Sequence, residues 1–418
     1  MFIKKFTLTL LAAFSLWATV SGQDDYYNYD YVYVDNIASV KFYAGNNPLA
    51  YPITTVRGNP PLILKFDDLE ADSKDYFYKI IHCDSDWQAS NLEEEDYLDG
   101  FNGEEISDKT DSKFTLTQYT HYRLVLPNEN TRWTISGNYL LIIYDDDDNV
   151  VITRRFLVAE NKVKIYASIE HAKDVTKYNS YQSVHVTLDI KDYNVVDPLK
   201  ELKTTVLQNQ RWLDAKKNVH PKYLVGTEVR FDAFDPFLFK GLNEFRYFDT
   251  RTLMATNLEV YSIEVNRDKI DVILEKDKIR KFHNYFFHKD INGNFLILNQ
   301  DRPDGDITGQ YTDVYFTLET LAPVKDGDVY VIGGFCDWQL YDYNKLTYDE
   351  ELESYTGNIL LKQGVYDYYY AVVDKKGNVD LSAMEGSWFD TQNSYMILVY
   401  HRPFGGRYDK LVGFRIIE

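Results

Sequence analysis

Hydrophobic and polar residues alternate in many short runs along the chain, and Gly, Pro, Asn and Asp separate the runs. Alternation with a period of two predicts β-strands that bury one face. Three of the clearest runs are Tyr122–Leu126, Val184–Ile190 and Tyr366–Val372. No long helical period occurs, and only residues 92–100 favour one or two helical turns. Short strands bounded by turn residues are typical of sandwiches, so we expect an all-β fold of tandem immunoglobulin-like β-sandwich domains.

The runs divide into about three predicted domains. A chain of 418 residues is too long for one ordinary core. We expect a first sandwich at residues 23–159, a second at 160–267 and a third at 268–418. In the third, Asn292-Gly293 predicts a tight hairpin turn between two strands.

The N-terminus predicts export. Lys4 and Lys5 precede an apolar stretch, residues 8–20, that is too short to span a bilayer as a stable helix. Small residues follow it, so we expect residues 1–22 to be a signal peptide that is removed. No later apolar run approaches the length of a membrane span, and we expect no direct membrane span. The four alternating tyrosines of residues 27–33 would line one face of an edge strand or belong to a solvated leader.

The longest segment between predicted strands follows the strand at 76–82. Connections of about thirty residues are usually functional or disordered, and disordered segments are normally poor in aromatic residues. Residues 84–111, here called the acidic segment, hold eleven acidic residues and one basic residue with aromatic residues interleaved. Aromatic residues ringed by carboxylates are typical of a protein contact that a basic partner surface would recognise. The candidate partner-binding residues are Trp87, Glu93, Glu94, Glu95, Tyr97 and Phe101. The alternative is a solvated acidic surface whose aromatic residues only anchor the segment to its own domain.

Composition disfavours several other functions. The formal net charge of -20 disfavours binding to nucleic acid or to anionic lipid. The two cysteines, Cys83 and Cys336, fall in different predicted domains, so we interpret them as small buried residues rather than a disulfide. The eight histidines are scattered, and no motif for a zinc protease, a nucleotide phosphate or an activated serine occurs. We therefore expect no enzymatic activity, no cofactor and no metal site.

Four pieces of the first predicted domain carry a family pattern. They are HCDSDW at 82–87, EEDYLDGF at 94–101, YTHYRLVLPN at 119–128 and SGNYLL at 136–141. These pieces resemble the N-terminal domain of the type IX secretion system plug proteins of Bacteroidota, and the resemblance extends loosely over nearly all of the chain after residue 22. It implies a periplasmic protein that seals the periplasmic opening of the outer-membrane translocon barrel when no substrate complex is engaged. That barrel is the implied partner, and it would hold the protein at the inner face of the outer membrane.

Part of the third predicted domain shows a second resemblance. VYVIGGFCDWQ at 329–339 and GVYDYYYAVVDKKGNVD at 364–380 resemble early-set immunoglobulin-like modules that bind glycogen and starch. Trp338 falls at the position of a sugar-stacking Trp in those modules. Their lysine corresponds to Tyr369 and their second Trp to Val379, so two of three sugar contacts are missing. The resemblance implies an early-set fold and, as an alternative function, an exported glycan-binding protein that uses Trp338 and Tyr369.

Overall fold

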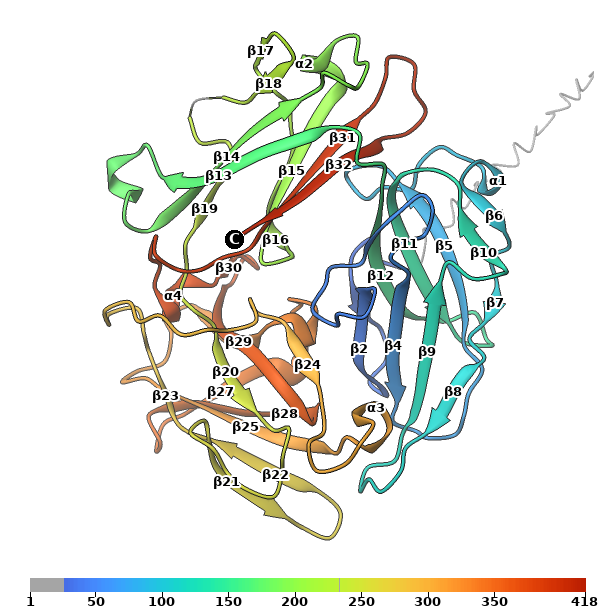
Figure 1. Ribbon diagram of the computed structural model, residues 1–418. Coiled ribbons are helices and arrows are strands. Elements are labelled where there is room, and N and C mark those ends of the chain that lie inside the picture. Colours follow the sequence, from blue (N-terminus) through green and yellow to red (C-terminus); the bar gives the residue numbers. More distant parts are fainter. Residues whose placement is uncertain (1–25, 233) are drawn as a thin grey trace, which may run out of the picture.

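The computed structural model describes residues 26–232 and 234–418, and its regular structure is almost entirely β-strand (Figure 1). The prediction of an all-β, sandwich-like fold is confirmed. Among the described residues, no helix has the length and apolarity that crossing a membrane requires. The predicted signal peptide, residues 1–22, lies outside the described residues.

The first domain is a sandwich of two antiparallel sheets with a small two-stranded extension. One sheet has the order β1 (Tyr31–Val32), β12 (Val150–Ala159), β11 (Gly137–Tyr144), β5 (Phe77–Cys83) and β7 (Glu104–Glu105), with β3 (Ile53–Thr55) parallel to β12. The other has the order β2 (Ile37–Ala44), β4 (Leu62–Asp68), β9 (Thr120–Leu126) and β8 (Asp108–Asp111); β6 (Leu98–Gly100) pairs with β10 (Thr131–Trp133). On β9 the predicted alternation is confirmed, because Tyr122 and Leu126 enter the core while His121 and Arg123 do not.

The alternating tyrosines belong to the fold. Tyr31 lies in β1, which adds to the edge of β12 through the pairs Tyr31–Thr153 and Val32–Ile152. The rings of Tyr27 and Tyr29 stack at 4.7 Å between centroids, and the ring of Tyr31 stacks on Tyr341 of the third domain at 5.0 Å. The edge-strand interpretation is confirmed for Tyr31 alone, whereas Tyr27, Tyr29 and Tyr33 lie outside the strand.

The second domain is a sandwich that takes two strands from the C-terminus. One sheet has the order β13 (Lys164–His171), β14 (Tyr181–Asp189), β18 (Glu228–Arg230) and β17 (Tyr223–Val225), with β19 (Leu238–Lys240) on β14. The other has the order β16 (Arg211–Val219), β15 (Leu202–Gln208), β31 (Tyr395–His401) and β32 (Lys410–Ile417). The C-terminal strands therefore lie beside β15, as Figure 1 shows in red and green. The predicted boundaries 160–267 and 268–418 are wrong here, because alternation identifies a strand but not the sheet it joins.

The third domain is inserted between β19 and β31. Its sheet has the order β20 (Arg246–Asp249), β29 (Gly364–Asp374), β26 (Gly327–Ile332), β27 (Lys345–Asp349), β28 (Ser354–Lys362), β25 (Tyr311–Glu319), β22 (Ile270–Leu274) and β21 (Val260–Val265). Three short strands flank it: β23 (Asp277–Lys278), β24 (Phe295–Ile297) and β30 (Val379–Asp380). Asn292 and Gly293 turn the chain with φ of 55° and 77°, but residues 281–289 before them form no strand, so the predicted hairpin is wrong.

The helices are single turns that connect strands. They are α1 (Glu94–Tyr97), α2 (Pro198–Glu201), α3 (Gly305–Thr308) and α4 (Ser382–Glu385), with 3-10 turns η1 (Val175–Lys177), η2 (Gly334–Cys336) and η3 (Asp342–Asn344). The helical turns expected at residues 92–100 thus shorten to α1, which continues directly into β6.

An apolar interface joins the first two domains. Strands β11 and β12 are buried on both faces, so alternate residues enter different cores. Leu141 and Phe156 fill the first sandwich, whereas Leu140 and Leu157 meet Leu398 of β31 across the interface. At about 25 cal/mol per Å² of buried apolar area, such a second core holds neighbouring domains firmly together.

Polar contacts join the first domain to the third. The Lys362 ammonium of β28 lies 2.6 Å from Asp67 Oδ2 of β4, and the Tyr311 hydroxyl donates to the same oxygen at 2.7 Å. The Tyr119 hydroxyl donates to the Gly309 carbonyl at 3.0 Å. The three domains therefore pack as one body rather than as a string.

Candidate functional site

The acidic segment is held to the first domain along its length. Its strands β6, β7 and β8 pair with β10, β5 and β9. Gly100 has φ of 118°, and a Cβ there would lie 1.8 Å from the Asn130 carbonyl oxygen, so only glycine permits the close approach of β6 to the chain before β10. The prediction of an ordered surface segment is confirmed.

Two of the three candidate aromatic residues anchor this segment. Trp87 is 2% exposed and meets Trp212 of the second domain edge-on at 5.1 Å, beside the guanidinium of Arg155. Tyr97 is 6% exposed, its hydroxyl donates to the Ile80 carbonyl at 3.3 Å, and burial raises its pKa to about 12. The expectation that Trp87 and Tyr97 present themselves to a partner is therefore corrected: packing against their own chain removes both side chains from the surface.

Phe101 is the candidate aromatic residue that remains on the surface, with 71% of its area exposed. Its backbone is fixed on both sides, because its N–H donates to the Asn130 carbonyl at 3.0 Å and its carbonyl accepts from the Thr131 hydroxyl at 3.1 Å. A fixed backbone under an exposed ring lowers the entropy that binding would remove.

Some acidic residues of this segment are paired with arginines and others are exposed. Asp96 accepts from the Glu93 N–H at the start of α1 and forms an ion pair with Arg407 at 2.9 Å, and Asp84 forms an ion pair with Arg402. The three glutamates that precede or begin α1, Glu93, Glu94 and Glu95, are exposed; Asn102 donates to Glu94 at 2.9 Å. These three carboxylates and Phe101 form what is here called the acidic face.

The two candidate sugar-binding residues do not form a sugar platform. Tyr369 is fully buried, and its hydroxyl donates to the Asn243 carbonyl, so it is corrected to a core residue of the third domain. Trp338 is half-buried between Phe245 and the guanidinium of Arg211, at 5.9 Å and 5.2 Å from its ring. The indole thus already has an aromatic and a cationic partner in its own chain.

Trp338 lines a polar cavity of about 160 Å³ where the three domains meet. Arg155 and Arg154 of β12 lie there, 2.7 Å from Asp30 and 2.9 Å from Asp337. Burial raises the pKa of Asp337 to about 6, even though Arg154 opposes the shift. The Arg154–Asp337 pair joins the first domain to the third, whereas the Arg155–Asp30 pair lies within the first domain, so these charges already have partners in the chain and the first pair helps to hold the domains together.

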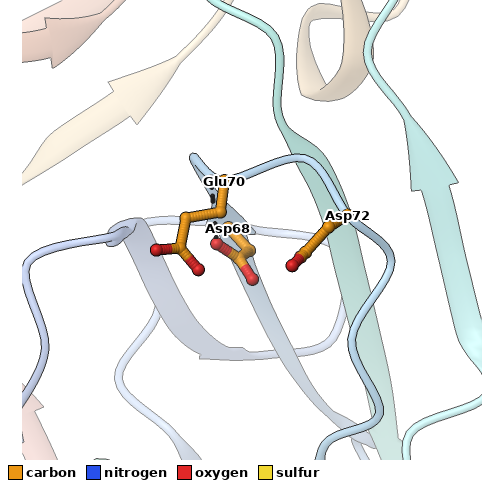
Figure 2. Close-up of side chains that lie close together, drawn as sticks. All are labelled: Asp68, Glu70 and Asp72. Carbon is orange, nitrogen blue, oxygen red and sulfur yellow. Dashed lines mark hydrogen bonds between the residues drawn. The ribbon is translucent and has the colours of Figure 1, made fainter.

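A cluster of carboxylates that sequence reasoning missed lies at the end of β4. The carboxylates of Asp68, Glu70 and Asp72 converge, as Figure 2 shows, and their spacing would suit a cation. The Lys74 ammonium already lies 3.6 Å from Asp68 and 3.9 Å from Asp72 and also pairs with Glu70. Asp68 further accepts from the Tyr76 hydroxyl at 2.9 Å. The lysine thus supplies the positive charge that a metal ion would bring.

The two cysteines, Cys83 and Cys336, are free and buried, as expected. Burial raises the pKa of both thiols to about 12. A thiol with a raised pKa is a poor nucleophile, so neither cysteine is suited to catalysis.

Comparison with known proteins gives a family for the first domain and a relative for the whole chain. The family model described as "Type 9 secretion system plug protein 1st domain" matches residues 37–160, close to the predicted first domain at 23–159. A solved structure of a hypothetical protein from Parabacteroides merdae ATCC 43184 is 31% identical, with a TM-score of 0.89 over 93% of this chain and 98% of that chain. The three-domain arrangement, including the insertion, is therefore shared with this relative.

A weaker similarity concerns a sugar-binding protein. SGBP-B of the Bacteroides ovatus mixed-linkage glucan utilization locus, solved in complex with a mixed-linkage heptasaccharide, is 12% identical. The alignment covers 82% of this chain and 93% of that chain at a TM-score of 0.08, so it carries no argument about fold or function. No curated protein matches the chain.

Proposed function

The chain belongs to the type IX secretion system plug protein family, and we propose that it is a periplasmic protein that seals the inner opening of the outer-membrane translocon barrel. The match of the plug first-domain model to residues 37–160 carries this proposal. Closure would be steric and without enzymatic activity. It would also be reversible, ending when a substrate complex occupies the barrel.

Two features of the structure support a steric role. The three domains share buried interfaces, so we expect them to resist displacement as one rigid unit. The acidic face projects from the first domain, the part of the chain that matches the plug family. We assign the contact with a basic surface of the barrel to Glu93, Glu94, Glu95 and Phe101, while Trp87 and Tyr97 hold the segment in place.

The test is affinity purification of the tagged full-length protein from detergent-solubilised membranes of its own cells. Stoichiometric recovery of a very large outer-membrane barrel is the expected result. Recovery of no barrel from cells that contain a type IX system would overturn the proposal.

The contact itself is tested by the triple variant Glu93→Gln, Glu94→Gln and Glu95→Gln. Glutamine keeps the shape and the hydrogen-bond acceptor that Asn102 uses at Glu94, and Asp96 stays to cap α1 and pair with Arg407. Exposed charge pairs contribute about 0.2–1 kcal/mol each, so the loss of three should lower barrel affinity roughly 3- to 150-fold at low salt.

A matched control removes three carboxylates elsewhere. Asp146, Asp147 and Asp148 are exposed in the turn between β11 and β12, and changing them to Asn alters the net charge equally. The control should keep its affinity, and high salt should remove the difference between wild type and the glutamine variant. Equal affinity for all three proteins at low salt would refute the acidic contact.

A further inference from the structure

The segment that joins β23 to β24 (Figure 1) contains three phenylalanines within residues 280–289, and their side chains are exposed. The exposed fractions are 84% for Phe282, 78% for Phe286 and 48% for Phe287. Residues 281–289 form neither helix nor strand. Residues 280–289 are here called the phenylalanine loop. The loop exposes large apolar side chains to solvent, and an exposed apolar patch usually marks a binding surface.

The loop is built to hold these rings outward. Three of its residues fix it to the domain: Arg280 donates to Glu385 at 2.7 Å, the Tyr285 hydroxyl donates to the Asp390 carbonyl at 3.0 Å, and His288 Nε2 lies 2.6 Å from the Phe245 carbonyl oxygen. The backbone N–H groups of Arg280 and Lys281 both donate to the Met384 carbonyl. The exposed phenylalanines lie between these fixed points, so they are not the ends of a loosely placed segment.

The charge of the loop is opposite to that of the molecule. Lys281, His283 and Lys289 are exposed, and the Lys281 ammonium lies 5.9 Å from the Phe282 ring centre. Arg280 and Asp290 are engaged at the base of the loop, with Glu385 and with the Phe245 N–H. Asp390 is the exposed carboxylate at that base. The molecule as a whole carries a net charge of -20, which disfavours binding to anionic lipid, but those of its charges that lie more than about 8–10 Å from the loop are screened at physiological salt.

We propose that the phenylalanine loop docks the protein on an anionic lipid bilayer, with the three rings in the interfacial layer and Lys281 and Lys289 at the lipid phosphates. Aromatic and basic residues on one short surface match that interface, where the rings leave water and the ammonium groups meet anionic headgroups. A protein partner fits less well. At about 200 Å² for a whole phenylalanine side chain, the exposed parts of the three rings offer roughly 420 Å², so a stable protein interface of about 800 Å² per side would need as much again from neighbouring residues.

Binding to defined vesicles tests this without the barrel, so its outcome is independent of the proposed plug function. The mature full-length chain is sedimented with vesicles of equal parts phosphatidylglycerol and phosphatidylethanolamine, and in parallel with vesicles of phosphatidylcholine alone. We expect binding to the anionic vesicles and at least tenfold weaker partitioning of the variant Phe282→Ser, Phe286→Ser, Phe287→Ser. The variant Lys281→Gln, Lys289→Gln should lose roughly 30-fold in affinity for anionic vesicles and little for neutral ones.

The chain offers a matched control in three other exposed phenylalanines. Phe114, Phe234 and Phe404 are 72%, 88% and 99% exposed, and changing all three to Ser removes the same apolar groups at other places. This control should bind vesicles like wild type. A second readout uses Phe286→Trp, whose emission should shift to shorter wavelength when anionic vesicles are added.

Three outcomes would overturn the proposal. One is a wild-type protein that binds no vesicles at millimolar lipid. Another is equal loss of binding in the loop variant and the control, which would show unspecific adsorption. The third is normal vesicle binding by the loop variant together with lost recovery of a protein from membranes, which would make the loop a protein contact.

Discussion

The buried carboxylate of Asp67 should be one of the most costly side chains to remove from this protein. It belongs to β4 of the first domain and is 1% exposed, as is its partner Lys362 of the third domain. Oδ2 takes the Lys362 ammonium at 2.6 Å and the Tyr311 hydroxyl at 2.7 Å, and Oδ1 lies 2.6 Å from His121 Nδ1. Burial opposes ionisation of Asp67, but the Lys362 ammonium and the His121 hydrogen bond outweigh it and lower the pKa of the carboxyl. Burial lowers the pKa of the Lys362 ammonium, and the Asp67 carboxylate opposes that shift; because the two groups are in direct contact at 2.6 Å, we treat them as an ion pair in the folded protein.

The size of the effect follows from the ion pair. Two unit charges 2.6 Å apart attract by about 6 kcal/mol at an effective dielectric constant of 20. Desolvation of the two ions costs several kcal/mol each and offsets that attraction. Asp67→Ala removes the attraction and leaves the cost of the buried ammonium, so it should lower the free energy of unfolding by about 3–5 kcal/mol. The double variant Asp67→Asn, Lys362→Met removes both charges and should lose less than Asp67→Ala.

Urea unfolding followed by circular dichroism measures these differences at pH 7. The cycle also needs Asp67→Asn and Lys362→Met alone, and their coupling energy should be at least about 2 kcal/mol. Additive single effects would refute the reasoning. So would a loss below about 1 kcal/mol for Asp67→Ala.

Three further predictions concern other parts of the fold. Burial lowers the pKa of His82 to about 4, below the unfolded value of about 6.5; its stabilising effect is thus complete above pH 6.5 and lost as pH falls towards 4. Wild type should lose up to about 3 kcal/mol more than His82→Gln over that window, as urea titrations at each pH would show. Gly100→Ala should lower the free energy of unfolding by about 2 kcal/mol or more, because its Cβ would lie 1.8 Å from the Asn130 oxygen. Gly405→Ala, at φ of 76° with nothing within 4 Å of the added Cβ, should lower it by only about 1 kcal/mol. Thermal melts of the two variants and wild type measure the difference. Leu157→Ala removes a fully buried side chain between the first two domains and should cost about 2–5 kcal/mol in urea; a loss below 1 kcal/mol would mean that the interface repacks or does not form.

The strands were predictable because their information is local. On β9, Tyr122, Leu124 and Leu126 alternate with polar residues, and this alternation predicts which face of the strand is buried. The prediction does not depend on which strand lies beside β9. The C-terminal run at 395–401, which forms β31, lies in the predicted third domain at 268–418. Its assignment to the third domain failed because the register from Leu202–His401 to Gln208–Tyr395 is a property of two segments far apart in sequence.

The candidate surface was predictable in part. Eleven acidic residues with interleaved aromatic residues marked the acidic segment, and the structure confirms that it is ordered. Sequence could not rank its aromatic residues, since Trp87 and Phe101 differ only in what packs on them: Trp212 covers the first and nothing comparable covers the second. The phenylalanine loop was not predicted, because its apolar residues suggest a β-strand before the turn at Asn292-Gly293. Only the structure shows that residues 281–289 pair with no other strand.

The sequence by itself determined the chemistry available at each position: an acidic β-rich chain with an aromatic, carboxylate-rich segment in the domain that carries the family pattern. The hydrophobic period, the charge pattern and the motifs depend on residues that are close together along the chain, so they can be identified from the sequence alone. The tertiary structure alone decided which strands share a sheet, which aromatic residues face solvent, and that Asp67 meets Lys362 across 295 positions. Burial and pairing depend on what lies nearby in space, and only folding brings such distant residues together.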